Sequence, residues 1–432
     1  MKVEIQELDS CKRQLLVEAP EAEVTAAWTA ACDRIQRDAR LPGFRRGKVP
    51  RTLVRSRFAD EVRRAVAETL VPEVYRRALD ETRLDPVEEP DLRDLRLEEG
   101  QPLRFTAVVE VKPAIVLDRY RGVTARHTPG AVSDADVEAA LTSLAERRAT
   151  LATVNRPARS GDFVTADYEL APEGQPPRRE EGYTFEVGAG RVLPDMDEAA
   201  LGLAAGDERR LTVRFPDDHP RVELKGATGQ LTLRVTEVKE KEVPPLDDEF
   251  ARGLGSHETL ADLRAAVRTE LQASMARQNR LTLEQALVDA VLATHAFAVP
   301  ESLVLREVTH RIGHARERVR RQGVDPDRLP WDYARLTAEL RPDAERAVRR
   351  ALLLEAIAER EEIAVDEAEV DAEIERLARD AGRAPQAMRS LLERGGDLAG
   401  LRLALREQKT LDFLIQHADV QPAESAPGTV TR

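Results

Sequence analysis

The sequence predicts a multidomain α+β protein in three parts: a small α+β module, an antiparallel β domain with one short helix, and a discontinuous all-α domain. Three observations predict it. The 432 residues exceed the size of one ordinary domain. Alternating, strand-like segments occur only near the N-terminus and near the middle of the chain. Elsewhere helical spacing dominates, and a content of 34% charged and 4% aromatic residues is typical of solvated helices.

The first module is predicted to span residues 1–113. "KVEIQEL" and "RQLLVEA" have the pattern of short strands, and apolar residues then recur at helical spacing over residues 21–39. The Pro-Gly pair at 42–43 is expected to end this helix. A second helical pattern starts at Asp60, and Pro72 is expected to kink or divide it. "LRFTAVVEVKP" closes the module as a strand.

Residues 153–240 are predicted to form the antiparallel β domain. "DFVTADYEL", "RRLTVRFP" and "GQLTLRVTEV" alternate with a period of two. A short helix is expected from Asp195 to about Leu203, because Pro194 and Gly206 bound an apolar segment between the strands.

The all-α domain is predicted in two pieces, 114–152 and 241–420, on either side of the β domain. The first carries a helix from Ser133 to about Leu151 that opens on a capping signature with Asp136. The second is nearly all helix as far as His417, with breaks expected at these positions: Pro300, Pro326 to Pro330, Pro342 and Gly395-Gly396. The polar segment 421–432 is predicted to be a disordered tail.

Apolar residues at helical spacing in this domain are expected to form core rather than an open surface. They are Leu260, Leu263, Val267 and Leu271, then Val348, Leu352 and Leu354, then Leu411, Leu414 and Ile415.

Composition excludes several classes of function. A net charge of −13 makes the chain a poor general nucleic-acid binder, so no DNA partner is expected and any RNA contact needs a local basic patch. Cys11 and Cys32 form no CxxC motif, which suits a reducing cytosol. We see neither a signal peptide nor a membrane span, so we expect a cytoplasmic protein without a membrane partner.

The sequence carries one candidate metal motif. His310 and His314 have the i, i+4 spacing of a helical metal pair, but no glutamate lies between them as in a zincin, and arginines surround them. A solvated helix face is the preferred interpretation. We also find no Ser-His-Asp arrangement, and we expect no cofactor and no metal.

The most unusual segment is the basic loop, residues 40–59, which contains Phe44 and no acidic residue. Its basic residues are Arg40, Arg45, Arg46, Lys48, Arg51, Arg55 and Arg57. The spacing excludes a Walker phosphate loop, because only three residues separate the two glycines and Val49 follows Lys48. Two interpretations remain open: a solvated face with Phe44 folded back on its own domain, or a docking loop whose cations meet phosphates or acids while Phe44 fills an apolar pocket.

"GFRRGKVP" resembles the ribosome-docking signature of the trigger factor family, G-F-R-x-G-K-x-P, and fills each of its fixed positions. The order of the three parts is similar to that family over nearly the whole chain. By this resemblance the first module is a ribosome-docking domain, residues 153–240 are an FKBP-type prolyl isomerase domain, and the helices form a chaperone domain. The implied docking residues are Gly43, Phe44, Arg45, Arg46, Gly47, Lys48 and Pro50.

The resemblance also implies partners. They are the protein and RNA of the large ribosomal subunit at the tunnel exit, together with nascent and unfolded polypeptides. It implies ATP-independent holding of new chains, assistance with folding and export, and a homodimer away from the ribosome.

Prolyl isomerisation must overcome a barrier of roughly 18–20 kcal/mol from amide resonance, which a dry apolar pocket lowers by favouring the twisted amide. By the same resemblance the pocket residues are Asp167, Tyr168, Phe185, Val192 and Leu193. Asp195, Met196 and His219 depart from the family, which commonly has Gly, Phe and Tyr there. We therefore expect weak activity. The alternative is that the apolar members of this set are simply core.

Two other functions are kept as alternatives. A free cytosolic prolyl isomerase would use the helices only to present substrate. An RNA-binding factor would use the basic loop alone, but no aromatic stacking platform accompanies its arginines.

Overall fold

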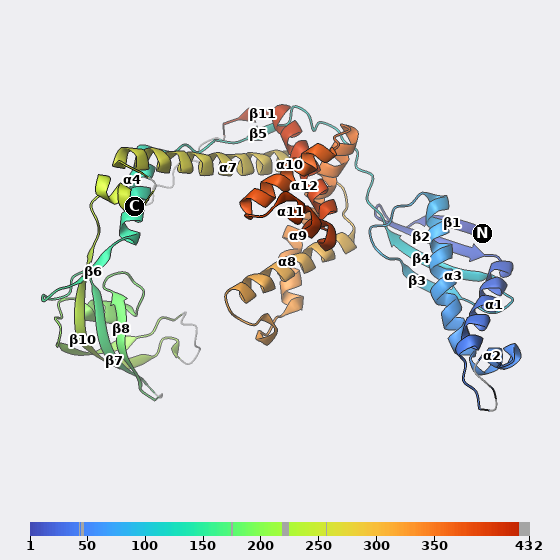
Figure 1. Cartoon of the computed structure of the whole chain (residues 1–432), viewed down its shortest axis with the longest axis horizontal. Coiled ribbons are helices and arrows are strands. Elements are labelled where there is room, and N and C mark those ends of the chain that lie inside the picture. Colours follow the sequence, from blue (N-terminus) through green and yellow to red (C-terminus); the bar gives the residue numbers. More distant parts are fainter. Residues whose placement is uncertain (43, 45–46, 174–175, 218–223, 256, 423–432) are drawn as a thin grey trace. The chain divides into compact units, whose positions relative to one another are not determined.

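The computed structural model describes residues 1–42, 44, 47–173, 176–217, 224–255 and 257–422. It divides into two compact units, Met1–Thr128 with Leu281–Arg432, and Pro129–Arg280. Figure 1 shows the elements of both.

The N-terminal part of the first unit is an antiparallel sheet with the strand order β1-β2-β4-β3. Its strands are β1 (Lys2–Glu7), β2 (Lys12–Ala19), β3 (Asp91–Arg96) and β4 (Leu103–Glu110). Three helices follow the first hairpin: α1 (Glu21–Asp38), α2 (Arg51–Arg57) and α3 (Ala59–Thr82). Their core combines Leu15 of β2 and Phe105 of β4 with Trp28 of α1 and Val66 of α3, all buried.

This part confirms the predicted hairpin strands and the first helix, and it corrects two predictions. Pro72 lies inside α3, which runs unbroken from Ala59 to Thr82, so it does not divide the helix. Residues 51–57, predicted as loop, form α2. The edge strand β3 was not predicted at all, because its side chains are exposed along its whole length and carry no pattern of burial.

The rest of the first unit is helical, apart from a parallel pair of short strands, β5 (Thr124–Arg126) and β11 (Asp419–Gln421). The helices are α8 (Glu301–Arg321), the 3-10 turn η2 (Pro326–Arg328), α9 (Tyr333–Arg360), α10 (Glu367–Asp380), α11 (Pro385–Gly395) and α12 (Asp397–Gln416). The breaks predicted at Pro300 and at the two glycines after residue 394 are confirmed, whereas Pro342 lies within α9 and does not interrupt it.

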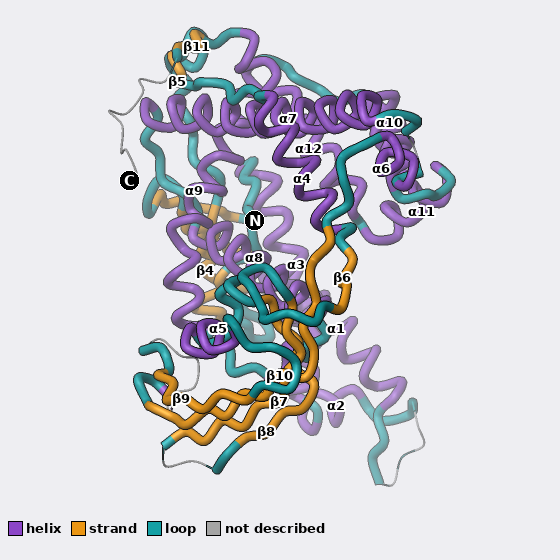
Figure 2. Tube along the Cα trace, turned by 90° about the vertical axis from the view of Figure 1, so that its left-hand side faces the viewer, coloured by secondary structure: helices purple, strands orange, loops and turns teal. Residues whose placement is uncertain are grey.

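The second unit holds the β domain. Its strands are β6 (Thr150–Thr153), β7 (Phe163–Pro172), β8 (Arg178–Glu186), β9 (Glu208–Arg214) and β10 (Thr228–Glu242). They form an antiparallel sheet in the order β6-β10-β7-β8 (Figure 2). The strand β9 pairs with the first half of β10 on the edge opposite β7, and β6 pairs with the last residues of β10 on that same edge. The short helix α5 (Pro194–Ala200) packs on this sheet, as predicted, and buries Met196, Ala199 and Ala200.

Helices on both sides of the β domain in the sequence pack on each other within the second unit. They are α4 (Asp134–Arg147), α6 (Asp248–Gly253) and α7 (Leu260–Thr294), which ends in the first unit. Leu141 of α4 and Leu263 of α7 share one apolar cluster. The predicted capping box is confirmed: Ser133 and Asp136 cap α4 reciprocally. The β domain is therefore an insertion between two helical segments.

The apolar stripes singled out in the helices are core. Leu263, Val267, Val348, Leu352, Leu354, Leu411 and Leu414 are buried, while Leu260, Leu271 and Ile415 are half-buried. Within the described residues, no helix is both long and apolar enough to cross a membrane. Of the predicted tail, 423–432 lies outside the described residues, and Gln421 is the last residue of β11.

Candidate functional site

The first half of the basic loop, residues 40–50, connects α1 to α2, and the second half forms α2 itself. Of the predicted docking residues, Gly43, Arg45 and Arg46 lie outside the described residues. The Phe44 side chain is 41% exposed, and its backbone N–H donates to the carbonyl of Leu41 at 3.0 Å. Phe44 thus does not fold back into its own core, which favours the docking interpretation over the solvated face.

The end of the loop is anchored to α1. Val49 is fully buried, and its carbonyl accepts a hydrogen bond from Nε2 of Gln36 at 2.6 Å. Gly47 has a φ of +78°, a left-handed conformation that suits glycine. Lys48 is exposed between these two residues. Pro50 then forms the N-cap of α2. The packing therefore presents Lys48 to solvent from a fixed backbone.

Two arginines of the basic loop have local roles. Arg51 binds Asp33 of α1 at 2.6 Å, and Arg55 binds Glu99 at 3.1 Å. In the sequence these cations look unpaired, because their acidic partners lie outside residues 40–59. They are better described as ties between α2 and the rest of the N-terminal part.

In the β domain an aromatic row crosses β7 and β8. The rings of Tyr168 and Tyr183 meet edge-on at 5.6 Å between centroids, and Tyr183 stacks with Phe185 at 6.0 Å. Tyr183 was missed from the sequence. The available signal was the period of two in "GYTFE", which places Tyr183 and Phe185 on one face of β8.

The loop before α5 carries Val192 and Leu193, which are half-buried against the same apolar cluster as the aromatic row. This loop is held by the buried carboxylate of Asp197, which accepts hydrogen bonds from the N–H groups of Gly188 at 2.6 Å and Gly190 at 3.1 Å. Sequence reasoning missed Asp197 because a carboxylate in a helix usually faces solvent.

Asp167 does not join the aromatic row. Its Oδ1 accepts a hydrogen bond from the N–H of Gly182 at 2.9 Å, where the register between β7 and β8 shifts. Four of the five predicted pocket residues, Tyr168, Phe185, Val192 and Leu193, therefore come together in one cluster, while Asp167 braces the hairpin.

The residues that depart from the family have clear local roles. Met196 is buried in the core of the β domain, and Asp195 accepts a hydrogen bond from the Arg214 N–H at 2.7 Å, which ties α5 to β9. His219 lies outside the described residues. The Asp195 carboxylate thus has a backbone partner of its own.

The Tyr168 hydroxyl is hydrogen-bonded to a carboxylate. Burial, followed by the hydrogen bond from its hydroxyl to Glu180 at 2.6 Å, raises the pKa of Tyr168 to about 12. Like an ordinary tyrosine, Tyr168 is therefore a neutral hydrogen-bond donor at neutral pH.

The first unit also contains a groove of about 970 Å³. Leu303, Val348, Ala351 and Leu352 contribute apolar surface to it. Its charged lining residues are Asp85, Lys112, Arg306, Glu307, Glu355, Arg406 and Glu407. A groove that is apolar with charges of both signs can accept an extended peptide without selecting one sequence.

Comparison with known families matches three segments. Residues 1–144 match the family described as bacterial trigger factor protein, residues 154–236 match FKBP-type peptidyl-prolyl cis-trans isomerase, and residues 259–416 match the bacterial trigger factor C-terminus. The predictions of a three-part α+β fold and of an FKBP-type isomerase are confirmed. An isomerase without the other parts is not favoured, because these matches extend along the chain.

Individual relatives support membership of the same family. The trigger factor of Moorella thermoacetica is 35% identical over 98% of this chain and 96% of its own length. That of Geobacillus kaustophilus is 33% identical over 97% of this chain and 100% of its own length. A solved trigger factor chaperone, described for promiscuous substrate recognition in folding and assembly, shares the fold with a TM-score of 0.51 at 20% identity, covering 96% of this chain and 99% of that one. The chain belongs to the trigger factor family, the ribosome-associated chaperones with an FKBP-type peptidyl-prolyl isomerase domain.

Proposed function

We propose that this chaperone docks at the tunnel exit of the large ribosomal subunit through the basic loop and holds emerging chains there without ATP. The observation that carries the proposal is the exposed Phe44 ring in a loop that fills the family's docking signature. An aromatic ring beside several cations fits a surface of mixed protein and RNA, where the ring enters an apolar pocket and the cations meet phosphates or acids.

The proposed docking residues are Gly43, Phe44, Arg45, Arg46, Gly47, Lys48 and Pro50. The anchored Val49 and the left-handed Gly47 support this assignment, because a fixed loop loses less conformational entropy on binding. Arg51 and Arg55 are left out, since each already has an acidic partner.

The proposed domains are residues 1–113 for docking, 114–152 and 241–420 for the helical chaperone domain, 153–240 for the isomerase, and 421–432 as a tail. The N-terminal sheet ends at Glu110, which supports the first boundary. The sheet of the β domain runs from Thr150 to Glu242, slightly wider than the proposed 153–240.

For the isomerase we propose a pocket built on Tyr168, Tyr183, Phe185, Val192 and Leu193, with Asp167 bracing its hairpin. Weak activity is proposed because Met196 replaces an aromatic ring of the family pattern. The aromatic row still supplies apolar faces for a proline ring.

For nascent and unfolded chains we propose the 970 Å³ groove as one contact surface. Its apolar residues suit exposed hydrophobic side chains, and its charged residues keep it wetted when empty. We further propose that the protein acts in the cytosol, which its two unpaired, buried cysteines support. A homodimer away from the ribosome is proposed on family membership.

The test of docking is co-sedimentation of the untagged full chain with bacterial ribosomes. The triple variant Phe44→Ala, Arg45→Ala, Lys48→Ala is expected to stay in the supernatant while the parent chain pellets. The matched control, Arg51→Ala with Arg55→Ala, removes two cations of the same loop and is expected to pellet like the parent. Docking through this loop is wrong if the triple variant pellets as well as the control.

A further inference from the structure

Two exposed histidines lie one helical turn apart on α8 and belong to neither the basic loop nor the isomerase pocket. The Nε2 atoms of His310 and His314 are 3.0 Å apart, and the ring centroids are 4.4 Å apart with the ring planes nearly perpendicular. The two outer nitrogens therefore face each other at hydrogen-bonding distance on the exposed side of the helix.

This spacing is that of two ligands on one metal ion. Imidazole binds first-row divalent metals at about 2.0–2.1 Å, so two bonds at a right angle separate the two nitrogens by about 3 Å. At this distance one ring donates its Nε2–H to the Nε2 of the other. A metal ion bonded to both Nε2 atoms would need that proton to move to Nδ1 of the same ring, and both rings to turn slightly so that their lone pairs meet at the ion.

A carboxylate favours the required tautomer. Oε2 of Glu307 lies 3.9 Å from Nδ1 of His310. A negative charge on that edge favours a proton on Nδ1 and leaves the Nε2 lone pair of His310 available as a ligand. The i, i+3 and i, i+4 relationships among Glu307, His310 and His314 place all three on one helix face.

Two nearby arginines are compensated by acidic partners, whereas Arg306 and Arg318, one turn before His310 and one turn after His314, form no ion pair among the described residues. Arg311 binds Glu307 at 2.7 Å, and Arg316 binds both Asp327 and the hydroxyl of Tyr333. Over the part of the chain that is described, no three His, Cys, Asp or Glu side chains are grouped to hold a metal. Water would therefore complete the coordination, which suits ions that tolerate open sites with nitrogen ligands in a square-planar or octahedral arrangement.

We propose that His310 and His314 form a two-histidine site for a divalent transition metal, with Cu²⁺ bound more tightly than Ni²⁺ or Zn²⁺. His310 also lines the groove of the first unit, so the bound ion would lie at the edge of that groove. The metal would link two adjacent turns of α8 and stabilise them against unfolding.

The experiment is calorimetric titration of the untagged full chain with CuCl₂ in buffer containing free glycine, which masks weak single-histidine sites. One Cu²⁺ per chain is expected, with an electron paramagnetic resonance spectrum showing two nitrogen ligands. His310→Ala and His314→Ala should each weaken binding by at least about tenfold, or about 1.4 kcal/mol. His257→Ala, a control elsewhere in the chain, should bind like the parent.

A variant with the two histidines further apart tests whether their spacing, and not only their number, makes the site. His314→Ala combined with Arg318→His keeps the number of histidines and removes one positive charge, but it places the two rings about 12 Å apart along the helix. This variant should lose the site. Retained binding in it, retained binding in either single alanine variant, or no binding by the parent would each overturn the proposal.

Discussion

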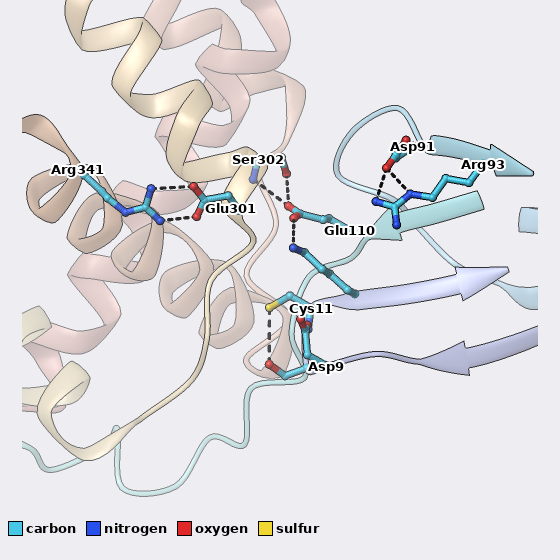
Figure 3. Close-up of polar contacts among 10 residues, drawn as sticks. Asp9, Cys11, Asp91, Arg93, Glu110, Glu301, Ser302 and Arg341 are labelled. Carbon is cyan, nitrogen blue, oxygen red and sulfur yellow. Dashed lines mark hydrogen bonds and ion pairs between the residues drawn. The ribbon is translucent and has the colours of Figure 1, made fainter. Parts of the chain in front are cut away.

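The carboxylate of Glu110, at the end of β4, accepts two hydrogen bonds from Ser302 at the start of α8: one from the backbone N–H at 2.8 Å and one from the hydroxyl at 2.6 Å (Figure 3). Pro300 is the N-cap of α8 and supplies no side-chain cap. A residue of the N-terminal sheet therefore satisfies a first-turn donor of the helical part, where a negative charge also interacts favourably with the helix dipole.

Removing this carboxylate should weaken the attachment of the sheet to α8. Glu110→Ala is expected to lower the free energy of unfolding by about 1–2 kcal/mol, because a charge-assisted hydrogen bond and a helix cap are lost together. Urea unfolding measures the change, and limited proteolysis within residues 111–123 should become faster. Glu4→Ala, at an exposed position of β1, is the control. Equal stability of the two variants would contradict this role for Glu110.

The sequence predicted elements whose own side chains carry the signal. The helix α1 was found because Val24, Trp28 and Ile35 recur at helical spacing and are all buried. The strand β3 had no such signal, because all of its side chains are exposed and it pairs with β4 only through its backbone at the sheet edge. Local pattern reveals an element only where one of its faces enters a core.

Tertiary packing explains why Pro342 does not interrupt α9, contrary to the prediction from the sequence. Pro342 removes one helical hydrogen bond from α9, but Ala344, Val348 and Leu352 further along the same helix are buried against α8. That burial outweighs a cost of about 3 kcal/mol for a proline in a helix. The groove beside these residues could not be predicted either, because its lining comes from segments far apart in the chain.

Tyr75 should make the N-terminal core sensitive to alkali. Burial alone raises the pKa of Tyr75 to about 12. Unfolded tyrosine ionises near pH 10, so between about pH 10 and 12 the unfolded chain binds fewer protons than the folded chain and stability falls as pH rises. Tyr75→Phe should lose this part of the pH dependence.

At pH 7 the same variant should be as stable as the parent or more stable by up to about 1 kcal/mol, because the Tyr75 hydroxyl has no hydrogen-bond partner among the described residues. Urea unfolding at pH 7 and pH 10.5 in a Trp331→Phe background leaves Trp28, in the same core, as the fluorescent reporter. A loss of more than about 1 kcal/mol at pH 7 would mean that the hydroxyl is satisfied after all.

Asp197 should matter to catalysis although it is not expected to touch substrate. Asp197→Ala leaves the N–H groups of Gly188 and Gly190 without their acceptor and frees the loop that carries Val192 and Leu193. We expect a loss of about 2–3 kcal/mol in domain stability and a lower isomerase rate. Protease-coupled or NMR exchange assays on a prolyl peptide give the rate.

Two variants separate positioning from folding at this loop. Asp197→Asn keeps one acceptor oxygen and should recover part of both stability and rate. Glu198→Ala, at the exposed neighbouring position, should change neither. A full rate in Asp197→Ala at a temperature where it is folded would show that the loop needs no such support.

Tyr183 supplies the sharpest test of the aromatic row, because it contacts both Tyr168 and Phe185. If the row forms the face that receives the proline ring, Tyr183→Ala should lower kcat/KM for prolyl isomerisation roughly tenfold, equivalent to about 1.4 kcal/mol of transition-state stabilisation. Tyr183→Phe and Tyr168→Phe keep the rings and should retain the rate. Tyr333→Ala removes a tyrosine from α9 instead and controls for general damage. If the row were only core, Tyr183→Ala would lower stability in urea while leaving kcat/KM of the folded protein unchanged, so the two measurements together decide whether these rings act on substrate.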